Sequence, residues 1–426
     1  MVNDQIVNNL MPNNLIKNFK YGDRVIMIVY ACLCIISIIA LFSASSYLAF
    51  NKSHEYTAPI LRHVFFIVAG AATAFLLYFM PQQIVRLAGY IGLAVSIVLL
   101  LYLAIFAEGG KDDANRWMDL GIFRFQPSEL AKLSLIVVVA DLLSRIKDSD
   151  NEKKFFWVIV LFVGVVCVLI MISNLSTALI LGAVVFAMMF VANINWKYLV
   201  GIVAVIVVVG LSGYGIAHKM VDSGVNFSGP LRRVPTWVNR VDNFFVAKDA
   251  DYKYNKNAEG NYQPYYSQLA VARGGASPLG VLPGNSVERD YLPQAFSDYI
   301  FAIIVEESGI LGALFVVLLY FLIVFRGGML AYKSESSYIA ILAMGISMMI
   351  TFQAIVSMMV VVGIIPVTGQ PLPMISLGGT SVIITSAYFG ILLGISRVQN
   401  GKIAAAQAVK QKSEENIPIV DIDEIE

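Results

Sequence analysis

Residues 291–325 read YLPQAFSDYIFAIIVEESGILGALFVVLLYFLIVF, a polar stretch that runs directly into a long apolar one. No charged residue occurs between Glu307 and Arg326. A run of about 20 apolar residues is long enough to cross a bilayer as a helix. Asp298 lies at the junction, and Glu306 and Glu307 lie inside the run, where acids are costly unless they are paired or hydrated. The stretch therefore predicts a membrane helix with acidic groups at its entrance.

The rest of the chain repeats this pattern. It is 58% hydrophobic and 14% charged, whereas about a quarter of the residues in soluble domains are charged. Ten apolar runs have the length of a membrane helix, at residues 25–48, 60–80, 84–106, 128–146, 155–173, 177–193, 197–216, 298–325, 336–362 and 378–397. We expect an all-α, polytopic membrane protein with about ten transmembrane helices and one large loop, at about 217–297, between the seventh and eighth.

Lysine and arginine placement predicts the orientation. The basic residues concentrate at the ends that ten alternating spans put on one side, at Lys17, Lys20, Arg24, Arg145, Lys147, Lys153, Lys154, Arg326, Lys333, Arg397, Lys402, Lys410 and Lys412. Cytoplasmic loops are enriched in such residues. We therefore expect cytoplasmic tails at 1–24 and 398–426, a membrane domain at 25–397 in the cytoplasmic (inner) membrane, and an extracytoplasmic loop at 217–297. A net charge of +1 gives no reason to expect nucleic acid as a partner.

Within the large loop, residues 264–272 predict a short interfacial helix, because Tyr265 and Tyr266 suit the headgroup level. Residues 273–280 are rich in turn formers, and the polar stretch 246–262 is typical of a mobile loop. Loops of this length are usually functional or disordered.

A first candidate set lies at 114–132. Pro127 suits the first turn of a helix, and Glu129 and Lys132 are three residues apart, so they share a helix face. This pair is either a structural ion pair or part of a site in the bundle interior. Arg116 and Arg124 precede it, and their guanidinium groups suit either a diphosphate or lipid headgroups.

The second set is Asp298 with the two glutamates. A carboxylate just before a helix is either an N-terminal cap or, at a membrane edge, a catalytic group. Glu306 would lie about 12 Å deeper and about 80° round the helix from Asp298, so it is the glutamate expected to line the same cavity. The alternative for Glu306 and Glu307 is pairing with a buried cation such as Lys132.

The third set lies in the hydrophobic, Pro- and Gly-rich loop 363–381, which we expect to be re-entrant or packed against the mouth of the bundle. Gly378 and Gly379 precede a helix start, where backbone N–H groups can bind an anion; close helix packing by small residues is the alternative. Asn174 is expected to cap the sixth span.

Three segments together resemble the SEDS family of membrane glycosyltransferases, the RodA/FtsW/SpoVE group. They are Asn115-Arg-Trp with Gln126-Pro-Ser-Glu-Leu-Ala-Lys132, Gly284-Asn-Ser with Tyr291-Leu-Pro-Gln-Ala-Phe-Ser-Asp-Tyr-Ile-Phe-Ala302 and the Glu306-Glu307 pair, and Pro366-Val-Thr-Gly-Gln-Pro-Leu-Pro-Met-Ile-Ser-Leu-Gly-Gly-Thr-Ser381. The resemblance covers residues 24–400. It departs at Asn174, where family members often have Asp, and at Leu377, where Tyr is frequent.

The resemblance implies polymerisation of lipid II into glycan strands outside the cytoplasmic membrane. It makes Asp298 the general base on the acceptor hydroxyl, with Arg116, Lys132 and Arg273 as candidates for binding the leaving diphosphate. The expected supporting residues are Glu129, Glu306, Ser297, Thr368, Ser376, Gly378 and Gly379. A divalent cation, Mg²⁺ or Mn²⁺, is a further candidate for the positive charge that the leaving diphosphate needs.

The implied partners are a class B penicillin-binding transpeptidase and other membrane proteins of the division or elongation complex. The motifs favour the division-type enzyme over the elongation type. Two alternatives stay open: a lipid II flippase or transporter, which should hold its key charges near the membrane midplane, and a non-catalytic division scaffold.

Overall fold

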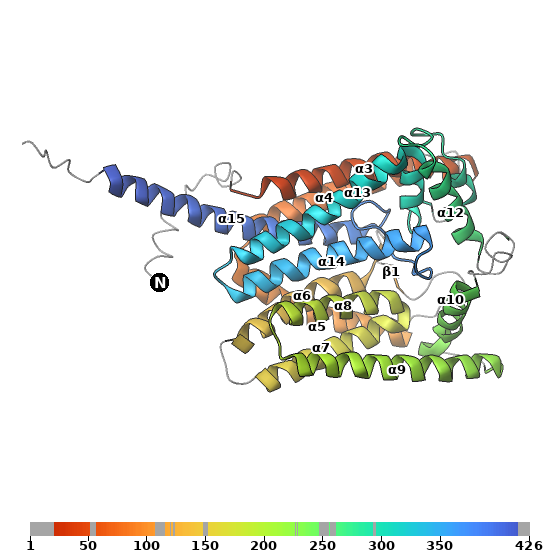
Figure 1. Ribbon diagram of the computed structural model, residues 1–426, viewed down its shortest axis with the longest axis horizontal. Coiled ribbons are helices and arrows are strands. Elements are labelled where there is room, and N and C mark those ends of the chain that lie inside the picture. Colours follow the sequence, from red (N-terminus) through yellow and green to blue (C-terminus); the bar gives the residue numbers. More distant parts are fainter. Residues whose placement is uncertain are drawn as a thin grey trace, which may run out of the picture.

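The computed structural model describes residues 21–51, 57–106, 116–119, 121, 124–147, 152–225, 227, 229–246, 255, 261–292 and 295–415. Ten long helices run side by side along its long axis (Figure 1). They are α3 (Arg24–Asn51), α4 (Thr57–Phe79), α5 (Gln82–Phe106), α6 (Pro127–Lys147), α7 (Glu152–Ser173), α8 (Leu175–Val191), α9 (Trp196–Asp222), α13 (Ile300–Tyr332), α14 (Ser337–Val362) and α15 (Thr380–Glu415).

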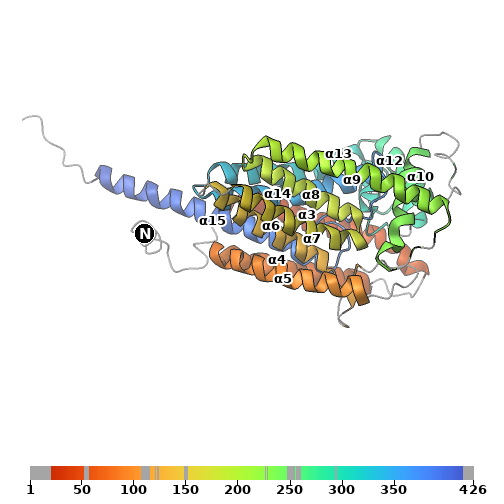
Figure 2. The same cartoon turned by 90° about the horizontal axis from the view of Figure 1, so that it is seen from below.

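Short elements gather at one end of the bundle, which we name the loop end. They are the antiparallel strands β1 (Met118–Asp119) and β2 (Arg124–Phe125), the helices α10 (Val234–Val246) and α12 (Tyr262–Gly275), and the 3-10 turns η1 (Gly229–Arg233) and η2 (Glu288–Tyr291). Figures 1 and 2 both place α10 and α12 there, and both show the end of α15 projecting from the opposite end.

The all-α, multi-pass architecture is confirmed. Eight of the ten long helices are apolar and long enough to cross a membrane. The other two differ for simple reasons: α8 has 17 residues, and α6 carries five charged side chains, at Glu129, Lys132, Asp141, Arg145 and Lys147. The count of ten spans therefore stays a prediction.

Burial explains why α6 belongs to the bundle despite its five charged side chains. Helix α6 is buried along most of its length, as are α14 and α15, whereas α9 buries only Leu199. Helices α3, α4, α5 and α7 also expose many large apolar side chains, which suits a surface that faces lipid. Glu129, Lys132 and Asp141 of α6 are therefore buried in the bundle, where other side chains pair with them.

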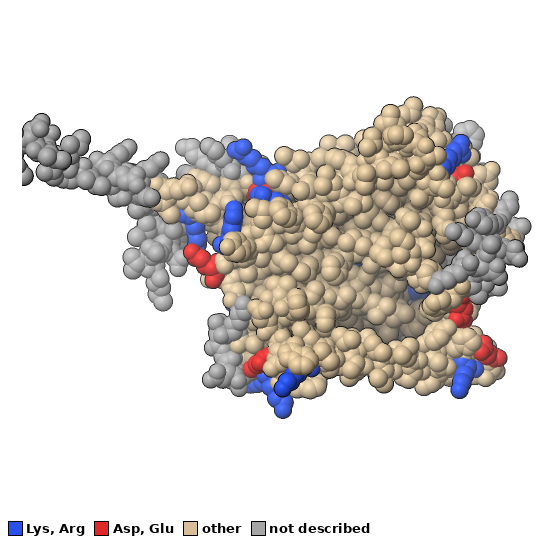
Figure 3. Space-filling view, viewed as in Figure 1, with Lys and Arg blue, Asp and Glu red and all other residues tan. Residues whose placement is uncertain are grey.

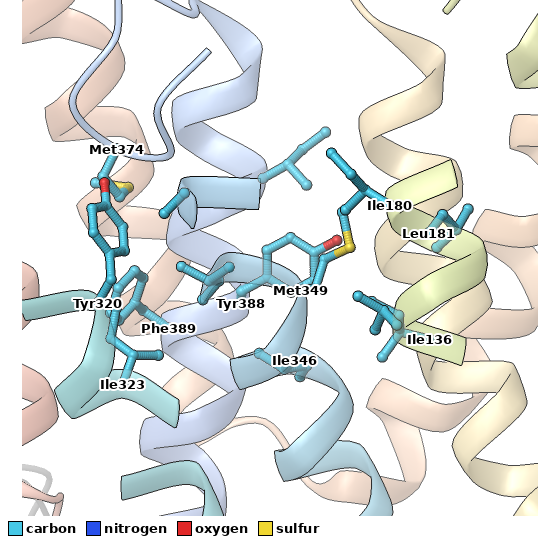
Figure 4. Close-up of a cluster of buried hydrophobic side chains, with 14 of the residues drawn as sticks. Ile136, Ile180, Leu181, Tyr320, Ile323, Ile346, Met349, Met374, Tyr388 and Phe389 are labelled. Carbon is cyan, nitrogen blue, oxygen red and sulfur yellow. The ribbon is translucent and has the colours of Figure 1, made fainter. Parts of the chain in front are cut away.

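The core joins helices that are far apart in the sequence. Figure 4 shows Ile136 of α6 near Leu181 of α8, and Tyr320 of α13 near Phe389 of α15. Helix α15 packs along α4 because Gly390 and Gly394 present no side chain: a Cβ at Gly390 would lie 2.6 Å from the Ala74 carbonyl oxygen. Small residues four apart allow this close approach of two membrane helices.

Helix α13 is broken at Gly309, whose φ of 65° is open mainly to glycine. The backbone of residues 277–280 fills the break, since a Cβ at Gly309 would lie 2.4 Å from the Pro278 carbonyl oxygen. The carbonyl oxygens of Glu306 and Glu307 accept hydrogen bonds from the N–H groups of Val281 and Leu282. The loop is thereby fixed to the first third of α13.

Several predicted boundaries need correction. Helix α9 ends at Asp222 rather than 216. Helix α15 continues to Glu415, and the boundary between membrane domain and tail at 397 stays a prediction. The short helix predicted at 264–272 is confirmed within α12. Helix α10 was not predicted, because its residues fall within the segment expected to form the large loop. Most of the segment expected to be mobile, 247–254 and 256–260, lies outside the described residues.

Candidate functional site

Asp298 lies at the loop end, in the turn that immediately precedes α13. The Ser297 hydroxyl donates to its Oδ1 over 3.0 Å. The N-cap of α13 is Tyr299, and no side chain makes a capping hydrogen bond there. The interpretation of Asp298 as a helix cap is therefore wrong. Its carboxylate is left to interact with other parts of the loop end.

The proline-rich loop holds the Asp298 turn in place. The Ser376 hydroxyl donates to the Ser297 carbonyl oxygen over 2.6 Å and accepts from the Leu372 N–H over 2.8 Å. The Leu377 N–H donates to the Phe296 carbonyl oxygen over 3.0 Å. The loop therefore packs against the mouth of the bundle, as its hydrophobic composition predicts, and Ser376 links it to the residue before Asp298.

Arg116 meets Asp298 at Gly369 of the same loop. Its Nη1 donates to the Gly369 carbonyl oxygen, and its Nε donates to the Ser173 carbonyl oxygen, both over 3.3 Å. A Cβ at Gly369 would lie 3.3 Å from Asp298 Oδ2 and 3.4 Å from Arg116 Nη1. The positive φ of Gly369, 64°, lets the loop backbone approach both groups.

Two further arginines, which the sequence analysis missed, join this cluster. Arg233 donates through Nη1 to the same Ser173 carbonyl oxygen that Arg116 binds. Burial, together with the nearby charges of Arg116, Arg240 and Arg232, lowers the pKa of Arg233 to about 10. Burial also lowers the pKa of Arg240, whereas the neighbouring Tyr299 and Asp298 raise it. The sequence could have indicated this pair, because a spacing of seven residues puts Arg233 and Arg240 on one face of a helix.

The environment of Asp298 suits a proton acceptor. Burial raises the pKa of its carboxyl group above the ordinary value of 3.8, while the Ser297 hydrogen bond, Arg116 and Arg240 lower it in part. A partly desolvated carboxylate is a stronger base than one in water. The adjacent arginines keep the charged form accessible, so Asp298 has the properties of a general base.

Glu306 and Arg273 belong to a second cluster. Arg273 Nη1 lies 3.8 Å from Glu306 Oε1 and 3.7 Å from Glu288 Oε1. Glu306 also accepts from the Ser286 hydroxyl and from the Val287 N–H. Its carboxylate holds the loop before η2, and its cationic partner is Arg273 rather than Lys132. Glu307 likewise accepts from the Ser43 hydroxyl and the Gly284 N–H.

Glu129 and Lys132 form the ion pair that their spacing predicts, with 2.8 Å between Oε1 and Nζ, and Lys132 is fully buried. Lys132 also donates to Gln353 Oε1 over 3.0 Å. Gln353 in turn donates to the Pro371 carbonyl oxygen over 3.3 Å. This pair is therefore linked to the loop that holds Asp298, while its charges neutralise each other.

The remaining candidates take varied positions. Thr368 Oγ1 is buried and has no hydrogen-bond partner among the described residues. Gly379 adopts a φ of 50°, and the Ser381 N–H donates to the Gly378 carbonyl oxygen at the start of α15. Arg124 lies 4.0 Å from Asp119 on the exposed β-hairpin. Asn174 caps α8 as predicted, accepting from the Thr177 N–H.

Figure 3 shows a recess at the loop end, below α14 and above α9, with blue basic atoms inside it. The cluster of Arg116, Arg233, Arg240 and Asp298 joins the end of α7 and helix α10 to the start of α13 at this end. The fold and site thus define a multi-pass membrane protein that places a partly buried carboxylate, Asp298, among arginines at its loop end.

The chain belongs to the FtsW/RodA/SpoVE family, described as cell cycle proteins, whose model matches residues 23–401. It is 28% identical over 385 residues to the probable peptidoglycan glycosyltransferase FtsW of Geobacter sulfurreducens, covering 89% of this chain and 96% of that one. It is 26% identical over 361 residues to the peptidoglycan glycosyltransferase MrdB of Escherichia coli K12, covering 84% and 91%.

Solved structures share the fold. The rod shape determining protein RodA of Thermus thermophilus superposes with a TM-score of 0.60 at 23% identity, covering 91% of this chain and 99% of that one. A chain from a structure described as "Structural coordination of polymerization and crosslinking by a peptidoglycan synthase complex" gives a TM-score of 0.66 at 24% identity, covering 89% and 98%.

Proposed function

We propose that this protein is a peptidoglycan glycosyltransferase that polymerises lipid II, with Asp298 as general base. The observation that carries the proposal is the partly buried Asp298 carboxylate, fixed at the loop end beside Arg116 and Arg240. The names of the family relatives support the reaction class.

In the proposed reaction, Asp298 accepts the proton of the acceptor sugar's 4-hydroxyl as that oxygen attacks the anomeric carbon of the lipid-linked donor. The bond from the anomeric carbon to the diphosphate oxygen breaks, and undecaprenyl diphosphate leaves with the electron pair. One displacement inverts the anomeric centre. A positioned base contributes about 10²- to 10⁴-fold to such a step, and a cation near the leaving oxygens stabilises their developing charge.

Arg116 is the strongest of the three predicted diphosphate ligands. It lies against the same glycine as Asp298. Lys132 is already paired with Glu129, and Arg273 with Glu288 and Glu306. We therefore propose that Lys132 and Arg273 position the loop end, while Arg116 contacts the leaving group.

A divalent cation fits the described residues poorly. No group of three or more His, Cys, Asp or Glu side chains suited to a metal occurs in the described part of the chain. The charged groups found near Asp298 are the arginines Arg116 and Arg240. We derive no step through a cation, and Mg²⁺ or Mn²⁺ brought in by the diphosphate stays a proposal.

The proposed setting is the outer face of the cytoplasmic membrane, with both termini in the cytoplasm. The partner we propose is a class B penicillin-binding transpeptidase, which would crosslink the new strand. The peptidoglycan synthase complex that contains a structural neighbour supports this pairing. We propose a role in septal synthesis, because the motifs favour the division-type enzyme. A role in elongation is the alternative within the family.

The test is polymer formation from labelled lipid II by the purified protein, alone and with a cognate transpeptidase. Wild type should form glycan strands, and Asp298→Asn should form them at least about 100-fold more slowly. Ser297→Ala is the control for the turn, because it removes the hydroxyl and keeps the carboxylate. Wild-type rates from Asp298→Asn would overturn the general base. Transfer of lipid II across vesicles without polymer would favour the flippase.

A further inference from the structure

The amphipathic helix α10 brings two arginines to the loop-end site. Arg233 ends η1, directly before α10, and Arg240 lies two turns further on the same face. Both are half-buried. Since a guanidinium group cannot readily lose its proton, each carries a charge that must be balanced when water is excluded.

Arg233 is placed by an anchor that it shares with Arg116. Both guanidinium groups donate to the Ser173 carbonyl oxygen at the end of α7. The helix dipole gives that end a partial negative charge, which offsets part of the repulsion between the two cations. The Ser173 carbonyl oxygen is the hydrogen-bond partner found for Arg233 among the described residues, so the Arg233 guanidinium group has further donors for another ligand.

Among the described residues, the charges that act on Arg233 are those of other arginines, and Asp298 is the one carboxylic acid found to act on Arg240. Arg116 and Arg240 both influence Asp298. The described residues supply no hydrogen bond or ion pair to the Arg240 guanidinium. Half-buried guanidinium groups of this kind favour an anionic ligand, and planar forked donors suit phosphate oxygens.

We propose that Arg233 and Arg240 of α10, together with Arg116, form a subsite for the diphosphate of a prenyl-diphosphate ligand. This inference rests on the proposed function for the identity of the ligand. Helix α10 is then a recognition element: it closes over the two phosphates beside Asp298, while the prenyl chain extends toward the bundle surface that faces lipid.

Tryptophan fluorescence provides a direct test, because Trp117 follows Arg116 and Trp237 lies in α10 before Arg240. The full chain in phosphatidylcholine nanodiscs is titrated with undecaprenyl diphosphate. Arg233→Gln and Arg240→Gln should each weaken binding about tenfold. Lysine at either position should restore part of the affinity. Arg232→Gln is the matched control, since Arg232 is exposed and adjacent to Arg233, and its affinity should stay within about twofold of wild type.

Other probes separate the sources of phosphate. Undecaprenyl monophosphate should bind more weakly than the diphosphate and lose less affinity in the variants. Phosphatidylglycerol added to the nanodiscs should not compete at equal concentration. Equal dissociation constants for wild type and both glutamine variants, an equal loss in Arg232→Gln, or equal competition by phosphatidylglycerol would each overturn the subsite.

The same titration separates this inference from the proposed function. Asp298→Asn should keep or tighten diphosphate binding, because it removes a negative charge from the cluster. Undiminished polymerisation by Asp298→Asn would defeat the general base and leave the arginine result standing. If the arginine variants bind the diphosphate normally and Asp298→Asn forms no polymer, the proposed subsite is wrong and the general base stands. Thermal unfolding of each variant checks that its fold is intact.

Discussion

The Asp298 carboxylate and the Arg116 guanidinium both lie against Gly369, so that a Cβ there would be 3.3 Å from the first and 3.4 Å from the second. These two side chains come from segments 182 residues apart in the sequence. The loop of residues 363–379 joins them, because its backbone accepts from Arg116 and its Ser376 holds the turn before Asp298.

Gly369→Ala should slow polymerisation about tenfold or more while the protein still folds. The added methyl group contacts both charged groups, and the positive φ strains any side chain at this position. Lipid II polymerisation and thermal unfolding measure the two effects. The control is Gly275→Ala in α12, where a Cβ would meet nothing within 4 Å. Equal rates in both variants would show that the approach of Gly369 is unimportant.

The pH dependence of polymerisation should report Asp298. Burial raises the pKa of this carboxyl group, and Arg116 and Arg240 lower it. A general base works when deprotonated, so activity should rise with pH through the pKa of Asp298, which lies above 3.8. Arg116→Gln removes a charge that favours the carboxylate, so the acidic limb should move to higher pH. A limb that moves to lower pH, or does not move, would contradict the assignment.

Lys132→Met should destabilise the protein by about 3–5 kcal/mol, because it leaves the buried Glu129 carboxylate without its cation. Thermal or denaturant unfolding in detergent measures the change. The double variant Glu129→Gln/Lys132→Met should recover part of the loss, since neither side chain is then charged. An unchanged unfolding midpoint in Lys132→Met, together with weaker diphosphate binding, would instead support the expected ligand role for Lys132.

Gly309→Ala should lower the stability by about 2–4 kcal/mol, because its positive φ and the backbone of residues 277–280 leave no room for a methyl group. The loop that Glu306 and Glu307 hold should also become more accessible to protease. Gly182→Ala in α8 is the control, since a Cβ there meets nothing within 4 Å. Equal stability of the two variants would show that the helix break is dispensable.

Much of the bundle follows from local properties of the chain. Long apolar runs form helices in a bilayer because no other partner satisfies their backbone groups, and all ten predicted runs are helical. The Glu129–Lys132 pair and the Asn174 cap also followed from spacing along one helix. The role of Arg233 and Arg240 could not be predicted in this way, because the sequence of a segment within a loop does not indicate what that segment packs against.

By itself, the sequence determined the membrane class, the positions of the helices and the family motifs that single out Asp298. Only the tertiary structure decided which cation serves which carboxylate. Arg273 pairs with Glu306, and Arg116 approaches Asp298. The reason is physical: helix formation depends on neighbouring residues, whereas charge pairing in a membrane bundle depends on which distant segments share the same buried space.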